Sequence, residues 1–335
     1  MKLNTTYLGL DLKNPLIVGA SPLTSDIASI KKLEAAGAAA IVIKSLFEEE
    51  IQLQRFVREE ESSKYNNLNP EMITIFPEMK HAGPKEHLYW VKKAKEAVSI
   101  PVIASLNAVN RETWLQYAKL LEETGVDALE LNFFYTPKSF QQTGAEIEAE
   151  QLQIMRELKA EVKIPIAVKL SSFYSNPLNF IHKIDQLGLE GVVIFNRMFQ
   201  PDINLESGKN IFPYNLSSSQ DNRLALRYSG LLSGQIKSDI CANTGIKQGE
   251  DLIKMILAGA GAVQIVSTIY QNGFAVIGEM LQELENWMQK NHYETLADFQ
   301  GSMNKQNNPD PWVYTRAQYV RLMMNPEKII KSNEI

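Results

Sequence analysis

Short apolar runs alternate with amphipathic segments along most of the chain. Eight runs of four to six mostly apolar residues are typical of parallel strands that are buried on both faces. Between them, apolar residues recur at helical spacing, for example over 26–36, 86–98 and 146–161. Strands that alternate with helices predict a parallel α/β fold, and eight repeats favour a (β/α)₈ barrel. The expected strands are 16–20, 40–44, 101–106, 128–132, 165–170, 191–195, 239–242 and 262–266.

The segments outside this alternation suggest the domain organisation. A hairpin is expected at residues 7–13, before the first strand, so residues 1–301 are interpreted as one barrel domain with an N-terminal hairpin. Residues 302–335 are expected to form a C-terminal extension that packs on or near the barrel, with a helix around 315–324. The irregular connection at 46–85 is long enough to predict a lid or an interface.

Polar residues stand at the ends of the expected strands. No GxGxxG motif follows the first strand, and Lys44 and Lys169 both lie at strand ends, so we favour the barrel over a doubly wound sheet. In a barrel, the carboxyl ends of all strands open on one rim, where catalytic residues gather. That rim would hold Ser21, Lys44, Ser105, Asn132, Lys169, Asn196, Thr244, Gly245 and Ser267.

Residues 238–267 have the pattern of a phosphate site. They are expected to form a strand, a loop with Thr244-Gly245, a helix, and a second strand that ends at Ser267. The loops after strands seven and eight of such barrels commonly direct backbone N–H groups at one phosphate. An ordinary strand–helix–strand unit with small turn residues explains the same pattern equally well.

Composition narrows the possible partners. The formal net charge of -5 argues against a nucleic-acid or anionic-membrane partner, and no stretch is long and apolar enough to span a bilayer. The single cysteine, Cys241, fits a reducing compartment, so a cytoplasmic location is expected. The four histidines are scattered without metal-ligand spacing, and no metal is expected.

A flavin mononucleotide (FMN) suits two lysines, two asparagines and a phosphate-binding turn on one rim. The pyrimidine edge of the flavin offers acceptors and a donor, which Asn132 and a lysine could match. A cation beside that edge stabilises the negative charge that develops on reduction. We therefore expect FMN as the cofactor.

Several stretches resemble the dihydroorotate dehydrogenase superfamily, which includes the flavin domain of dihydropyrimidine dehydrogenase. The resemblance covers most of residues 7–301 and is clearest in KNPLIVGAS, VIKS, VIASLNAVN, DALELN, PIAVKL and ANTGIKQGEDLIKMILAGAGAVQIVST. It implies an FMN-containing barrel that oxidises or reduces the C5–C6 bond of a pyrimidine ring, by hydride transfer between C6 and flavin N5.

The resemblance also implies roles for individual residues. Substrate contacts are expected from Asn107, Asn132, Asn196 and Arg197. Flavin contacts are expected from Ala20, Ser21, Lys44, Ser45, Asn132, Lys169, Asn196, Ser218, Ser219, Thr244, Gly245, Val266 and Ser267.

The chain departs from the family pattern in the substrate half of the site. Tyr135 stands where the family has its catalytic cysteine or serine, so Tyr135 is the positional candidate for the base and Lys44 is expected to hold the substrate-side geometry. An ordinary tyrosine, with a pKa of about 10, is a weak base at neutral pH. The substrate loop after strand two is not recognisable, although Phe76-Pro77 stands near it, and Thr244 replaces the first glycine of a Gly-Gly pair.

Other functions remain open at this point. The barrel could be an FMN oxidoreductase for a different small unsaturated substrate. It could be an aldolase or synthase in which Lys44 or Lys169 forms a Schiff base with a phosphorylated substrate. It could also bind a flavin without turnover. The resemblance makes a homodimer plausible, and an electron-acceptor partner is possible because one cysteine cannot hold an iron–sulfur cluster.

Overall fold

Eight parallel strands form a closed barrel within the part of the chain that the structure describes. In the computed structural model these described residues are 1–52, 84–137, 139–213 and 215–325. Every barrel strand is fully or almost fully buried, as the apolar runs predicted. The strands are β3 (Leu16–Val18), β4 (Ala40–Val42), β6 (Val102–Asn107), β7 (Ala128–Phe133), β8 (Ile166–Leu170), β9 (Gly191–Ile194), β12 (Asp239–Asn243) and β13 (Ala262–Ile265).

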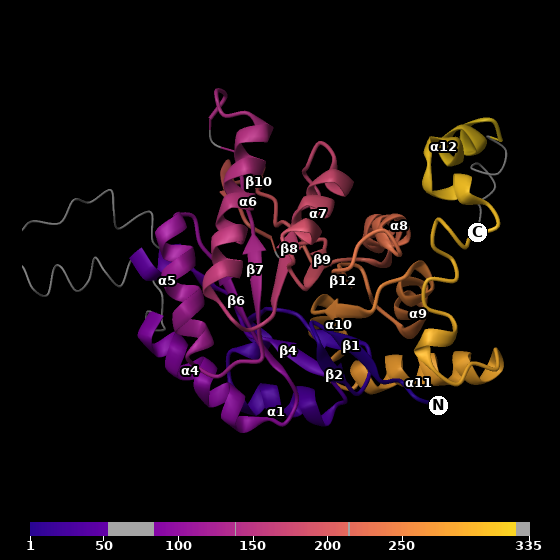
Figure 1. Cartoon of the computed structure of the whole chain (residues 1–335), viewed down its shortest axis with the longest axis horizontal. Helices are drawn as coiled ribbons and strands as arrows, with labels where there is room; N and C mark the ends of the chain where they lie inside the picture. The colour runs from indigo at the N-terminus through magenta and orange to yellow at the C-terminus, as the bar shows by residue number, and fades with distance from the viewer. Residues whose placement is uncertain (53–83, 138, 214, 326–335) are drawn as a thin grey trace, which may run out of the picture.

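The strand order is that of a (β/α)₈ barrel, which confirms the predicted fold class. Each strand pairs in parallel with the next barrel strand along the chain, and β13 pairs with β3 to close the circle. Strands β6, β7 and β8 stand side by side in Figure 1, with helices outside them. All strand carboxyl ends therefore open at one end of the barrel, called the mouth below.

Helices surround the barrel and follow the predicted amphipathic segments. Asp26 begins the first helix by accepting a hydrogen bond from Ser29 N (2.9 Å). Asn110 stands at the start of another, but its side chain donates to Glu48 and does not cap the helix. The helices are α1 (Ile27–Ala35), α4 (Pro84–Ala97), α5 (Arg111–Glu122), α6 (Gly144–Glu161), α7 (Pro177–Gln186), α8 (Arg223–Leu232), α9 (Gly249–Ala258), α10 (Ser267–Asn272) and α11 (Val276–Lys290), with short 3₁₀ turns η1 (Pro22–Thr24), η2 (Ser219–Asn222) and η3 (Leu296–Asp298).

The N-terminal hairpin, β1 (Thr5–Tyr7) and β2 (Leu10–Leu12), closes the end of the barrel opposite the mouth. Its turn residue Leu8 is buried, and Leu8 N donates to the carboxylate of Asp239, the first residue of β12 (2.7 Å). A Cβ added to Gly191, the first residue of β9, would lie 2.5 Å from Leu8 Cδ2. The hairpin therefore packs against the starts of the strands and leaves the mouth free for chemistry.

Two connections contain strands that the sequence pattern did not predict. The connection after β9 carries an antiparallel pair, β10 (Asp202–Asn204) and β11 (Lys209–Ile211), which is largely exposed. A short strand, β5 (Leu46–Phe47), pairs with the end of β6. Most of the connection expected to be a lid or an interface, residues 53–83 with Phe76-Pro77, lies outside the described residues.

The C-terminal segment contains η4 (Pro311–Tyr314) and α12 (Arg316–Met323), which falls within the range expected for a helix. Figure 1 shows α12 at the periphery of the molecule, away from the barrel strands. The Tyr314 ring packs on Gly230 of α8, where an added Cβ would come within 2.3 Å of it. Among the described helices, none has the length and the apolar character needed to cross a membrane.

Candidate active site

Three asparagine side chains form a row across the mouth. Asn107 ends β6, Asn132 lies near the end of β7, and Asn196 follows β9. Asn196 Nδ2 donates to Asn132 Oδ1 (2.8 Å), and Asn107 Nδ2 donates to the backbone oxygen of Asn132 (3.0 Å). We call these three residues the amide row. Amide side chains both donate and accept, so the row can bind the alternating donors and acceptors of a pyrimidine edge.

A buried ion pair lies beside the amide row. Lys169 is the register partner of Asn132 on the neighbouring strand, and its side chain is only 6% exposed. Lys169 Nζ donates to Gln264 Oε1 (3.0 Å) and lies 3.5 Å from Glu130 Oε1. Gln264 Nε2 in turn donates to Glu130 Oε2. An ammonium has three donors, so Lys169 has capacity left for a further acceptor at the mouth.

The turn after β12 contains two consecutive residues with left-handed backbone angles. Thr244 and Gly245 both have positive φ angles, 78° and 76°. A threonine in this region is strained, and here its hydroxyl donates to the backbone oxygen of Phe195 (2.9 Å). A Cβ on Gly245 would lie 2.3 Å from Asn222 N, so only glycine fits between this turn and the loop above it.

Ser217 links that loop to the turn after β13. Ser217 N donates to Ser267 Oγ (3.2 Å), and Asn222 Nδ2 donates to Gly245 O (3.3 Å). Ser267 begins α10, and Val266 precedes it as the helix N-cap. The two turns that were expected to share a phosphate are therefore held together by one loop. Ser218 and Ser219 are exposed, and their hydroxyls donate to Asp221 (3.2 Å) and Asp251 (3.3 Å).

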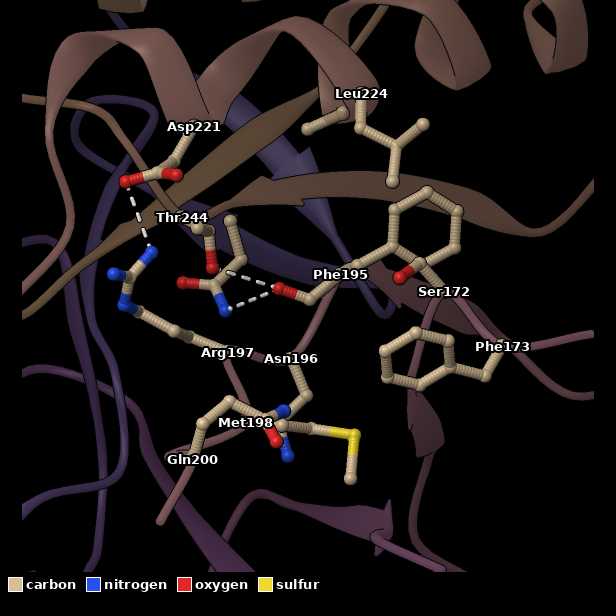
Figure 2. A pocket seen from close by; sticks show the side chains of 12 residues that line it. Ser172, Phe173, Phe195, Asn196, Arg197, Met198, Gln200, Asp221, Leu224 and Thr244 are labelled. Atoms are coloured by element: carbon tan, nitrogen blue, oxygen red, sulfur yellow. Dashed lines mark hydrogen bonds and ion pairs between the residues drawn. The ribbon is translucent and has the colours of Figure 1, made fainter. Parts of the chain in front are cut away.

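A pocket of about 200 Å³ opens next to Asn196 and Thr244. Figure 2 shows Arg197 directed at Asp221, with Phe173 on the other side of the pocket. The ion pair measures 2.9 Å, and Arg197 Nε also donates to Asn215 O (2.6 Å). Ligand pockets usually enclose about 300–1,000 Å³, so this one suits part of a ligand.

The ends of the first two strands contribute hydroxyls and a lysine. Ser21 Oγ, next to Ala20, is buried and has no hydrogen-bond partner among the described residues. Ser45 Oγ lies 2.7 Å from Ser105 Oγ, and both side chains are buried. Lys44 lies two residues beyond β4, and its Nζ forms an ion pair with Glu50 (2.6 Å).

Tyr135 follows β7, and its hydroxyl donates to Gln142 Oε1. Its partner is therefore outside the amide row. Gln264 and Ser217 were missed as candidate residues by sequence reasoning. A polar residue within the apolar strand AVQI is the signal that could have identified Gln264, because a buried amide needs partners. Ser217 stands in an irregular connection and gives no such signal.

Comparison with known proteins identifies relatives along nearly the whole chain. The sequence is 28% identical over 308 residues to the dihydroorotate dehydrogenase B (NAD(+)) catalytic subunit of Thermoplasma volcanium, covering 89% of this chain and 97% of that protein. It is 22% identical over 322 residues to the NAD-dependent dihydropyrimidine dehydrogenase subunit PreA of Escherichia coli, covering 90% of this chain and 77% of that protein.

A family comparison covers the same region. The sequence model described as "Dihydroorotate dehydrogenase" matches residues 2–288, which include all eight barrel strands described above. The chain therefore belongs to the dihydroorotate dehydrogenase family.

Proposed function

We propose that the protein is an FMN-dependent oxidoreductase that oxidises dihydroorotate or a related dihydropyrimidine. The observation that carries the proposal is the placement of Lys169 beside the amide row at the mouth of a barrel of this family. When bound, FMN would supply a hydride acceptor, N5, for the hydrogen on substrate C6.

Two features of the mouth fit FMN. The buried Ser21 hydroxyl has no partner among the described residues, so a ligand at the end of β3 would satisfy it. The Gly245 turn is closed to any Cβ, and the loop of residues 217–222 that packs on it also contacts Ser267, so both phosphate-type turns lie against one loop. We infer that Ser21, Ser45 and Lys169 hold the ring end, and that Thr244, Gly245, Val266 and Ser267 hold the phosphate.

The amide row would orient the pyrimidine substrate. Asn132 and Asn196 are already hydrogen-bonded to each other, which fixes their side chains and lowers the entropy lost on binding. Arg197 is held by Asp221 at the neighbouring pocket, where its remaining donors could bind an anionic substituent such as a carboxylate.

Proton removal from substrate C5 is assigned to Tyr135 as a hypothesis. Its hydroxyl must exchange Gln142 for the substrate before it can act. Lys44 must likewise break its ion pair with Glu50, or contact the substrate while still paired with Glu50, to hold the substrate-side geometry. Both residues would then adopt their working positions only when substrate binds, as is common for catalytic hydrogen bonds.

A different unsaturated substrate is the second candidate. The pocket beside Asn196 is lined partly by Phe173, Met198 and Leu224, which suit an apolar substituent better than a bare pyrimidine. A substrate with such a substituent would use the same flavin and the same amide row.

The names of the relatives and the cysteine content of this chain bear on its protein partners. Two of the relatives are named as subunits, and this chain has one cysteine, which cannot hold an iron–sulfur cluster. We infer that reduced flavin passes its electrons to a separate acceptor, carried by a partner protein. We also propose that the protein forms a homodimer and is located in the cytoplasm.

Anaerobic reduction of the flavin tests this function. Dihydroorotate, dihydrouracil and dihydrothymine would each be added to the FMN-loaded protein while the visible flavin spectrum is followed. At least one is expected to bleach the flavin, and dithionite serves as the control for a reducible cofactor. Bleaching by dithionite with no response to any dihydropyrimidine would contradict the proposed substrate class.

A further inference from the structure

Glu130 is a charged residue that the proposed reaction does not use. It lies in the middle of β7 with 1% of its surface exposed. An unpaired carboxylate in such a place is very costly, so a carboxylate at this depth needs a cation and hydrogen-bond donors around it. Lys169 and Gln264 are the neighbours that provide them.

The three side chains form one connected unit. Gln264 accepts from Lys169 Nζ (3.0 Å) and donates to Glu130 Oε2, so its amide bridges the two charges. Glu130 Oε1 lies 3.5 Å from Lys169 Nζ and has no hydrogen bond within the described part of the chain. The carboxylate is thus held near the ammonium mainly by charge.

Tyr7 and Cys241, two other titratable groups near Glu130, carry no charge at neutral pH. Burial raises the pKa of the Tyr7 phenol and of the Cys241 thiol, and the nearby carboxylate of Glu130 raises both pKa values further. Asp239, at the start of β12, is occupied by the backbone N–H of Leu8. Inside the barrel, beside the amide row, the opposite charges of Lys169 and Glu130 therefore lie together.

We propose that Glu130 is a positioning residue that lowers the reduction potential of the flavin by offsetting the positive charge of Lys169. This inference rests on the proposed function, in which Lys169 lies at the flavin ring. A lone cation there would favour the negatively charged reduced flavin. The buried carboxylate cancels part of that effect, so the reduced flavin gives up its electrons more readily to the acceptor.

The expected effect is large because both charges are shielded from water. At an effective dielectric constant of about 20, a unit charge several ångströms from the ring changes the ratio of reduced to oxidised flavin by about tenfold or more. The Glu130→Gln variant keeps the shape of the side chain and one oxygen that can accept from Gln264, but it removes the charge.

The test is a redox titration of the FMN-loaded protein against a reference dye of known potential, with limiting dithionite. At a fixed ratio of reduced to oxidised dye, Glu130→Gln is expected to raise the ratio of reduced to oxidised flavin about tenfold or more. Cys241→Ala, a neutral change among the buried barrel residues, is the matched control and is expected to leave the ratio unchanged.

A double variant keeps the test decisive if Glu130→Gln fails to fold. Glu130→Gln with Lys169→Gln removes both charges, and replacing a whole buried ion pair is far better tolerated than breaking it. Its ratio of reduced to oxidised flavin is expected to fall by less than tenfold relative to the wild type, because the lost carboxylate offsets part of the effect of the lost ammonium. A tenfold or larger fall in the double variant, as if Lys169 acted alone, would overturn the inference, and so would an unchanged ratio in Glu130→Gln. Failure of the wild type to bind FMN would instead contradict the proposed function.

Discussion

At the residue scale, the positions that matter most are those where a polar side chain interrupts an apolar strand. Asn132 and Lys169 were identified from the sequence as polar residues at or near the ends of apolar strands, and the structure brings them into register on neighbouring strands. Lys169 is held there by its contacts with Glu130 and Gln264, which fix the position of its Nζ beside the amide row.

Tyr135 provides the first test at this scale. If its phenol removes the substrate proton, Tyr135→Phe should slow flavin reduction by substrate by about 10²-fold or more, because a positioned general base contributes about that much. Single-turnover stopped-flow absorption measures the rate. Tyr319→Phe, at an exposed tyrosine of α12, is the control. Equal rates in all three proteins would exclude Tyr135 from proton transfer.

The environment of His87 leads us to expect that the free energy of unfolding depends on pH. Burial, with a smaller contribution from Lys44, lowers its pKa to about 4, below the ordinary value of 6.5. As pH falls, the imidazole of the unfolded chain therefore binds its proton before that of the folded chain does. The stability contributed by neutral His87 is complete above pH 6.5 and is lost as pH falls toward 4.

The expected loss is at most about 1.4 kcal/mol per pH unit within that window. Urea unfolding at a series of pH values measures it. In His87→Leu the slope should be shallower by that amount, because the imidazole Nε2 is buried and has no partner within the described residues. A slope identical to that of the wild type would show that His87 titrates normally.

At the element scale, the strands and most helices follow directly from hydrophobic periodicity, because barrel strands buried on both faces are read as continuous apolar runs. The β10–β11 pair was not predicted, since each strand has only three residues and most of them are exposed. The short helix α10 has six residues, too few for a clear helical repeat. The local sequence pattern does not predict an element that is held in place by tertiary contacts and has no buried face of its own.

The hairpin that closes the barrel can be tested at Gly191. An Ala at this position would place its Cβ 2.5 Å from Leu8 Cδ2, so the buried Leu8 side chain or the whole hairpin must shift. Overpacking of this kind costs about 1–3 kcal/mol of unfolding free energy. Gly144→Ala is the matched control, since an added Cβ there meets open space. Equal stability of the two variants would mean that Leu8 does not seal the barrel.

The attachment of the C-terminal segment to the barrel domain can be tested at Gly230. Gly230→Ala would drive a methyl group into the Tyr314 ring, at 2.3 Å, and should release η4 and α12 from α8. Limited proteolysis with mass spectrometry is expected to show faster cleavage after about residue 305, with the barrel left intact. An unchanged cleavage pattern would indicate that other contacts hold this segment.

At the scale of the whole molecule, residues from every part of the barrel meet at one mouth. The fold class could be predicted from the sequence because strand–helix alternation is a repeated local signal. The amide row and the phosphate-type turns could also be predicted, from strand ends and family resemblance. The bridging role of Gln264 and the partners of Lys44 and Tyr135 could not, because they depend on side chains from distant segments.

The flavin content of the purified protein is the most direct test of the central claim, that this mouth binds FMN. We predict a yellow protein whose bound flavin is FMN at one molecule per chain. Gly245→Ala should lose most of it, because the methyl group would collide with Asn222 N at 2.3 Å and close the phosphate turn. A colourless protein that takes up no FMN from an excess of the cofactor would contradict the account.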